Sequence, residues 1–504
     1  MSCVPRFLAI VFALLCAALP ARAAQDAALE RGTAITDPAT LRELDGGKFR
    51  LDRTLLPERS ADIPLANSAL FALPSMAPIR QAIDGEFDRY VARHRVNLPK
   101  ETIGVGEGHD FQLFDRTLLY SAETRFVLAG IVNRMDRAYA AQASCGEIRL
   151  IYRLTRMNKV AGDDASPPRL PMTLNLVLRA KGEGSTITCS EIANRWLAAP
   201  PGEMPSAKDG PLDLISHENV DRIETNLQIA HAPKSAVRDF RTDYLLKVFR
   251  YDRDARVFAE APMENQVDRA RLLADDALKR EFRAWLLDPV NLAAFDRGTV
   301  LIPEKFLARG AIAPTPAGFD PSDLEPEFGL VQGEGAAFSE ADVVAALRKA
   351  AEGGVKLQNI RSPAGFERRL NDVTCSGCHQ TRGIGGFHFA GVDWMADKPS
   401  NSTVVPASPH FFGDQIRRRD ILASLRDGKP PDYSRGFASR PQLRGSAELA
   451  GTNYYDGWGA HCYVQGKPAA NNDGSFRDWT CAEGLTCQAA GKISRVGMCF
   501  VKSR

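Results

Sequence analysis

The residues best suited to chemistry are two cysteines and a histidine close together in the chain, Cys375, Cys378 and His379. They form the pattern C-x-x-C-H, in which two thiols three residues apart can both reach the vinyl groups of one porphyrin. The histidine that follows can bind the iron from the proximal side. The spacing predicts one covalently attached haem c. In a cytosolic chain, the same letters would also fit a redox dithiol, half a zinc site or chance.

The N-terminus helps to decide between these meanings. Arg6 supplies a positive charge, residues 7–19 form an apolar run, and Ala21-Arg22-Ala23 offers a small-x-small cleavage site. A membrane span needs roughly 20 apolar residues, so residues 1–23 are predicted to be a cleavable signal peptide rather than an uncleaved anchor. No other stretch is apolar enough to span a bilayer. We therefore expect a periplasmic or secreted protein, in the compartment where bacteria attach c-type haem.

The sixth iron ligand would decide what such a haem does. A methionine raises the reduction potential and suits electron transfer, a second histidine lowers it, and an open position allows peroxide or oxygen chemistry. Of the two methionines that follow the motif, Met395 is the better candidate, because Met498 adjoins Cys499 in a cysteine-rich segment. His388 and His410 compete with Met395, and the absence of any side-chain ligand is the third alternative.

The residues around the motif suggest a pocket. Residues 380–409 are rich in Gly, Pro and Ser and carry three aromatic side chains, which suit an apolar haem wall or an ordinary surface loop. Residues 339–351 are predicted to form a helix with Ser339 as N-cap. A second helix is predicted over 413–427. Its arginines, Arg417 to Arg419, could neutralise haem propionates or face solvent.

The remaining cysteines indicate disulfides. Cys3 and Cys16 would leave with the signal peptide, and six cysteines stay besides those of the motif, an even number in an oxidising compartment. Two of them flank alternating apolar runs at 148–154 and 174–179, with Cys145 before the first and Cys189 after the second. If these runs pair as antiparallel strands, their ends bring the two cysteines within bridging distance. A structural Cys145–Cys189 disulfide is predicted.

Four cysteines fall close to the C-terminus: Cys462, Cys481, Cys487 and Cys499. A short, loop-rich piece with four cysteines is typical of a module held by two disulfides, with three connectivities open.

The large region before the motif reads as an α+β domain built around an antiparallel sheet. Further strands are predicted over 244–251 and 256–259, and a helix over 265–287 that ends at Asp288-Pro289. We find no convincing site in this region. Its scattered histidines, His94, His109, His217 and His231, are expected to pack or face solvent. The charged cluster at 133–137 is compatible with a solvated turn or an ion pair.

Composition excludes little. Hydrophobic residues make up 44% and charged residues 25%, and the net charge is +2. Such a balance gives no indication of a nucleic-acid partner or an anionic membrane surface. A redox partner protein is expected, without any sign of its identity.

Residues 372–380, Asp-Val-Thr-Cys-Ser-Gly-Cys-His-Gln, resemble the haem-binding segment of cytochrome c domains. The resemblance implies that Cys375 and Cys378 carry thioethers and that His379 is the proximal ligand. The chain departs from that family in its short spacing to Met395 and in its large preceding domain. A single motif does not support the two-haem arrangement of bacterial cytochrome c peroxidases. Cys145-Gly146-Glu147-Ile148-Arg149, together with the later motif, also resembles a group of large secreted bacterial proteins, which implies topology rather than mechanism.

The sequence thus predicts an α+β protein in five parts. They are a signal peptide (1–23), an N-terminal extension (24–60), an α+β domain (61–330), a mostly helical and loop cytochrome c-like haem-binding region (331–445) and a cystine-rich module (446–504). The expected function is electron transfer or ligand sensing by an exported monohaem protein. One alternative is a haem enzyme of peroxidase or oxygenase type with an open distal site. Another is a secreted non-haem binding protein in which Cys375 and Cys378 form a structural disulfide.

Overall fold

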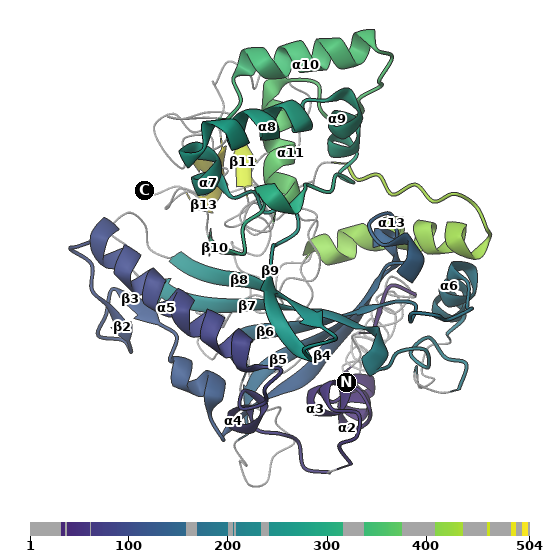
Figure 1. Cartoon of the computed structure of the whole chain (residues 1–504). Coiled ribbons are helices and arrows are strands. Elements are labelled where there is room, and N and C mark those ends of the chain that lie inside the picture. The colour runs from purple at the N-terminus through teal and green to yellow at the C-terminus, as the bar shows by residue number, and fades with distance from the viewer. Residues whose placement is uncertain are drawn as a thin grey trace, which may run out of the picture.

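The computed structural model describes residues 32–35, 38–60, 62–157, 169–199, 205, 208–232, 241–315, 337–374, 409–436, 461–463, 485–489 and 496–501. A ten-stranded sheet crosses its centre, with helices below it and a helical cluster above it in the view of Figure 1. Its strands are β1 (Ala34–Ile35), β2 (Ile103–Val105), β3 (Phe111–Leu113), β4 (Thr124–Arg134), β5 (Glu147–Arg156), β6 (Arg169–Arg179), β7 (Val220–Ala232), β8 (Arg241–Asp252), β9 (Val257–Ala261) and β10 (Gly310–Thr315).

The sheet is antiparallel except where β2 pairs with β3. Its strands run in the order β1-β4-β5-β6-β7-β3-β2, and β8 pairs with β7, β9 and β10. The α+β class and the antiparallel sheet predicted from the sequence are confirmed, as is the hairpin of β8 and β9.

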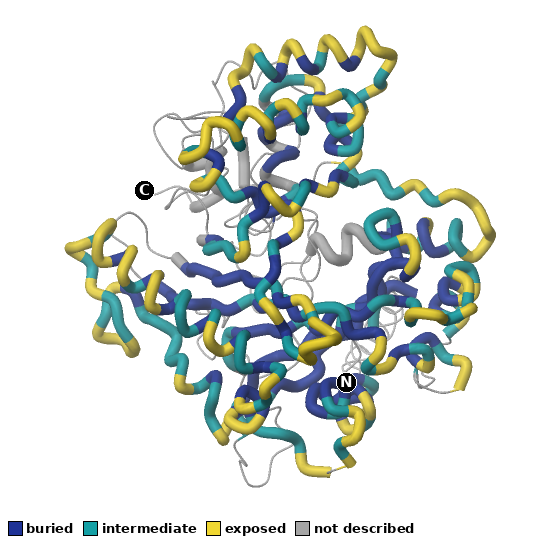
Figure 2. The backbone as a smooth tube through the Cα atoms, in the orientation of Figure 1, coloured by how far each residue is buried: buried dark blue, intermediate teal, exposed yellow. Residues whose placement is uncertain are grey.

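One face of the sheet forms the main hydrophobic core. Alternate residues of β5 and β6 point into it, so that Leu150, Tyr152 and Leu176 are fully buried. Figure 2 shows the dark blue of buried residues concentrated along the central strands. The helices α2 (Pro38–Gly46), α3 (Leu51–Leu55), α4 (Asn67–Leu70) and α5 (Ala77–Asn97) contribute to the same core. Tyr152 donates its hydroxyl hydrogen to the carbonyl oxygen of Phe49 at 2.7 Å, which satisfies the polar atom of an otherwise apolar site.

A second core holds the helical cluster together. It joins α7 (Arg269–Ala274), α8 (Asp276–Leu286) and α9 (Pro289–Asp296) to α10 (Glu340–Glu352) and α11 (Pro363–Val373). Phe295 and Phe338 both pack against Phe366 in tilted or edge-on contacts, with ring centroids 5.1 Å apart in each pair. This core therefore contains residues from both sides of position 330, where the sequence pattern placed a domain boundary.

The helix predicted over 265–287 is wrong in its continuity. It is broken at Asp275, which has extended backbone angles and whose carboxylate caps α8 by accepting the N–H groups of Ala277 and Leu278. A side-chain cap of this kind starts a new helix even where the apolar spacing continues. The helix predicted from Ser339 is confirmed as α10, with its capping box to Asp342. The next predicted helix begins earlier than expected, as α13 (Pro409–Arg426).

Three short strands near the C-terminus form a separate sheet in the order β11-β13-β12. They are β11 (His461–Tyr463), β12 (Leu485–Ala489) and β13 (Val496–Val501). The antiparallel register sets Cys487 opposite Cys499, whereas Cys462 is opposite Gly497. Cys481 lies outside the described residues, so the two disulfides of this module stay a prediction and the three connectivities stay open.

The Cys145–Cys189 disulfide is confirmed. β5 and β6 pair antiparallel, with Glu147 opposite Arg179, and the two cysteine Cα atoms lie 5.4 Å apart. Cys189 is the first residue of α6 (Cys189–Ala198), which packs against α13, and the Ser190 hydroxyl donates to the carbonyl oxygen of Arg426 at 2.6 Å. The disulfide therefore ties the sheet to the helix that supports α13.

Replacing both cysteines, as Cys145→Ser with Cys189→Ser, is expected to lower the free energy of unfolding by about 2–4 kcal/mol. The reason is that the disulfide closes a loop of 44 residues and so restricts the unfolded chain. Urea unfolding of the oxidised wild type and of the double variant measures the difference. Equal midpoints would contradict a stabilising role for this bond.

Candidate functional site

The predicted haem residues fall at the edge of what the structure describes. Cys375, Cys378, His379, His388 and Met395 lie outside the described residues. His410 belongs to α13, whose backbone is described from Pro409 onward. On the N-terminal side, α11 ends at Val373, and the buried Thr374 directly precedes the motif. The helices that precede and follow the motif in the chain are α11 and α13.

Helix α11 is anchored through Arg369, which is fully buried. Its guanidinium donates to the carbonyl oxygens of Asp296 and Arg435, each at 2.8 Å. The backbone N–H of Arg435 donates in turn to the carbonyl oxygen of Arg297 at 2.8 Å. Gly298 lies beside these groups at φ +69°, and a Cβ there would stand 3.2 Å from Arg369 and 3.4 Å from Arg435. The last residue of α9, helix α11 and the segment after α13 therefore meet at one guanidinium.

The carboxylate of Asp296 completes this junction. It accepts the backbone N–H groups of Gln358, Asn359 and Ile360 at 2.6–2.8 Å, in the loop that leads to α11. Three backbone donors satisfy a carboxylate that is only 1% exposed. The start of α11 is thereby fixed to the end of α9.

Asp136 is the centre of a buried ion cluster where the sheet meets α13. It lies in the short 3-10 helix Met135–Arg137 that follows β4, and its side chain is 1% exposed. Its carboxylate accepts hydrogen bonds from Arg134 at 2.8 Å, Arg417 at 2.7 Å and Arg435 at 2.8 Å. Arg417 is in α13 and Arg435 in the segment after it, so one carboxylate joins three parts of the chain.

The local backbone explains why Asp136 is presented there. The Asn133 side chain accepts the N–H of Met135 at 2.8 Å and donates to the carbonyl oxygen of Gly32 at 3.1 Å, which closes the turn after β4. Gly146, at φ +92°, passes so close that a Cβ would lie 2.7 Å from the Arg134 carbonyl oxygen and from the Met135 Cα. Only glycine fits this crossing without displacing the turn.

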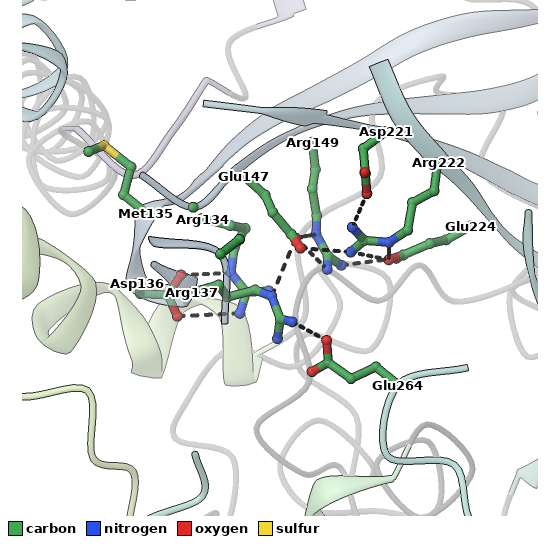
Figure 3. Close-up of polar contacts among 12 residues, drawn as sticks. Arg134, Met135, Asp136, Arg137, Glu147, Arg149, Asp221, Arg222, Glu224 and Glu264 are labelled. Atoms are coloured by element: carbon green, nitrogen blue, oxygen red, sulfur yellow. Dashed lines mark hydrogen bonds and ion pairs between the residues drawn. The ribbon is translucent and has the colours of Figure 1, made fainter. Parts of the chain in front are cut away.

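A second carboxylate, Glu147, organises the neighbouring arginines (Figure 3). It pairs with Arg222 at 2.9 Å, Arg149 at 3.1 Å and Arg137 at 3.3 Å. Glu224 bridges Arg149 and Arg222, and Glu264 binds Arg137. Because side chains alternate along a strand, these residues of β5 and β7 lie on the face opposite the hydrophobic core. The ion pairs around Glu147 thus lie at one end of the sheet, on the face that does not contact the main hydrophobic core.

Electrostatics keep the two carboxyl groups ionised. Burial alone would raise the pKa of Asp136, but the guanidiniums of Arg134, Arg418, Arg417 and Arg435 outweigh it and hold that pKa well below its ordinary value of 3.8. Burial also raises the pKa of Glu147, and nearby guanidiniums again outweigh it and hold that pKa well below its ordinary value of 4.5. These guanidiniums belong to Arg222, Arg137, Arg149 and Arg134. Neither group is poised to exchange protons near neutral pH, so the cluster is suited to holding elements together rather than to acid–base catalysis.

The contacts of these residues decide between the interpretations that their sequence patterns left open. The charged cluster at 133–137 is a buried ion pair, and the solvated-turn alternative is wrong. Arg417 pairs with Asp136 and Arg418 is 1% exposed, so a solvated face is wrong for these two residues. Their expected role at haem propionates stays a prediction. His94, His217 and His231 pack and hydrogen-bond within the domain, as expected.

Among the residues that the structure describes, no group of three or more His, Cys, Asp or Glu side chains could hold a metal ion. Within the same residues, no helix is long and apolar enough to cross a membrane. Comparisons with protein-family models, with curated proteins and with solved structures found no match to this chain. Function must therefore be argued from the residues alone.

Because the pKa of Glu147 is lowered by folding, its ionisation contributes stability that is present above its ordinary pKa of 4.5 and is lost as the pH falls below it. Glu147→Gln removes that contribution and leaves the buried arginines with less negative charge than they need, although Glu224 and Glu264 still bind them. We expect the variant to be about 3–5 kcal/mol less stable at pH 7. The difference from wild type should narrow in chemical unfolding below pH 4.5. A difference that stays constant from pH 7 to pH 2 would contradict this account.

Proposed function

We propose that this protein is an exported monohaem c-type protein that transfers electrons, or senses a small ligand, at one covalently bound haem. The observation that carries the proposal is the C-x-x-C-H pattern at 375–379 in a chain whose residues 1–23 have the pattern of an export signal. Two thiols and an imidazole are the donor set that attaches a porphyrin and ligates its iron. The donor chemistry therefore fits the group, although the motif lies outside the described residues.

The surroundings of the motif also support the proposal. Thr374, directly before Cys375, is 1% exposed, and α11 is held by a fully buried arginine. The chain therefore enters the motif from a firmly packed helix whose last residues have a fixed place in the fold. A haem site needs such fixed surroundings, because the direction of the proximal histidine sets the iron's coordination.

Each residue then has a stated role. Cys375 and Cys378 would hold the porphyrin through thioether bonds, and His379 would bind the iron. Met395, His388 or His410 would provide the second axial ligand, or that position would stay open. When bound, the haem supplies a one-electron couple whose potential depends on that ligand and on how dry the site is.

Haem attachment can be tested on the protein purified from a periplasm that contains the c-type maturation system. The wild type is expected to carry a covalent mass increase of one haem and no free thiol at Cys375 or Cys378. Cys375→Ala with Cys378→Ala should carry none, while Cys145 and Cys189 remain bonded as an internal control. A wild type without added mass, or with a Cys375–Cys378 disulfide, would favour the non-haem alternative.

The distal ligand can be assigned with three single variants, Met395→Ala, His388→Ala and His410→Ala. Loss of the true ligand should convert a six-coordinate, low-spin ferrous spectrum into one that responds to carbon monoxide, because an iron position becomes free. The two other variants serve as matched controls and should keep the wild-type spectrum. A wild-type iron that already binds carbon monoxide would instead favour a sensor or a peroxidase-type enzyme.

A further inference from the structure

The helices on both sides of the haem motif are linked to one carboxylate of the sheet domain. We infer that Asp136 is a positioning residue for the haem site: its charge holds α13 directly and α11 through Arg435. This inference rests on the proposed function, since it concerns the surroundings of the C-x-x-C-H motif. It also proposes a role for the large N-terminal domain, which no sequence pattern indicates.

The link to α13 is direct. Arg417, on the N-terminal half of the helix, binds the Asp136 carboxylate at 2.7 Å, and Arg418 beside it is 1% exposed. At the other end of α13, the Ser190 hydroxyl of α6 binds the carbonyl oxygen of Arg426. The helix that follows the motif is therefore held at two points. One is Asp136 of the sheet domain, and the other is α6, which the disulfide bonds to that domain.

The link to α11 passes through Arg435. The side chain of Arg435 binds Asp136 at 2.8 Å, while its carbonyl oxygen accepts from Arg369 of α11 at 2.8 Å. A ring contact between Tyr139 and Tyr433, with centroids 5.6 Å apart, joins the same two segments beside this bond. Movement of Asp136 relative to Arg435 would thus be passed to the helix that leads into Cys375.

The charge of Asp136, rather than its shape alone, makes the link. The Asp136 side chain is 1% exposed, so little water reaches the point where its carboxylate meets Arg417 and Arg435. Water therefore cannot easily replace the carboxylate there. An amide of the same size offers one acceptor oxygen and no charge, where the carboxylate has two oxygens and serves three arginines.

Glu147 provides a matched control. It is also a buried carboxylate that binds three arginines, but Arg137, Arg149 and Arg222 all belong to the sheet domain. Glu147→Gln and Asp136→Asn therefore cause the same chemical change at neighbouring places. Of these two carboxylates, Asp136 is the one that binds α13 and the segment after it, through Arg417 and Arg435.

The test compares these two variants in the full-length mature protein by hydrogen exchange and by the haem absorption spectrum. Asp136→Asn should increase amide exchange in 409–436 at least tenfold more than it does in β5 and β6, and it should alter the spectrum. Glu147→Gln lowers the stability of the whole fold, so it should raise exchange in 409–436 no more than in β5 and β6 and should leave the spectrum as in the wild type. Asp136→Glu, which keeps the charge, should recover part of the protection. Equal effects of Asp136→Asn and Glu147→Gln, or an unchanged spectrum in Asp136→Asn, would overturn the positioning role.

Single arginine variants keep the inference testable if Asp136→Asn does not fold. Arg417→Gln should raise exchange in α13 only, and Arg435→Gln should raise it in 427–436 and in α11, because each cuts one of the two links. Arg222→Gln, which removes an arginine from Glu147, is the control. The inference would be overturned if Arg417→Gln and Arg435→Gln gave the same amide exchange in α11, α13 and 427–436 as Arg222→Gln. A wild type without haem would overturn the proposed function and the positioning of a haem together, and exchange would still show whether Asp136 holds the helices.

Discussion

The carboxylate of Asp136 is the constraint on which the arrangement around the motif depends. It is buried, it stays ionised, and it binds arginines from β4, from α13 and from the segment after α13. A buried ion pair contributes little net stability compared with apolar residues of the same volume, but removal of one partner leaves an uncompensated charge and costs about 3–5 kcal/mol. Such a cluster therefore tolerates only arrangements in which every partner is present. Here that requirement selects one placement of α13 and of Arg435 against the sheet.

The rest of the fold keeps this cluster in register. The pairing of β4 with β5 sets Arg134 opposite Glu147, and the Gly146 crossing fixes the turn that carries Asp136. The disulfide that follows the same turn holds α6, and α6 supports α13. Backbone pairing, one glycine and one covalent bond therefore constrain the same few residues. These constraints place the charged groups close together.

Local periodicity could be predicted from the sequence. The Cys145–Cys189 pair follows from two alternating runs whose antiparallel order sets their ends together. The C-x-x-C-H pattern is also local, five consecutive residues, and the haem chemistry that it indicates stays a prediction. The helix over 265–287 was predicted as continuous because apolar spacing persists across Asp275, although a side-chain cap interrupts it. The partners of Asp136 gave no such signal. Arg417 and Arg435 lie 281 and 299 residues along the chain from it, and nothing in a local pattern pairs residues over that distance.

The choice of arginine in this cluster also has a physical reason. A guanidinium presents several donors in one plane, so Arg222 can bind Glu147, Glu224 and Asp221 together, and Arg369 can bind carbonyl oxygens on two segments. A lysine is a point charge with stronger hydration, and it would lose more on burial and reach fewer partners in a fixed geometry. Lysine at Arg417 or Arg435 would thus keep the charge at Asp136 and still lose the planar fork of donors. The cluster depends on the geometry of its donors as well as on its balance of charge, and for this reason it can fix the direction of a helix.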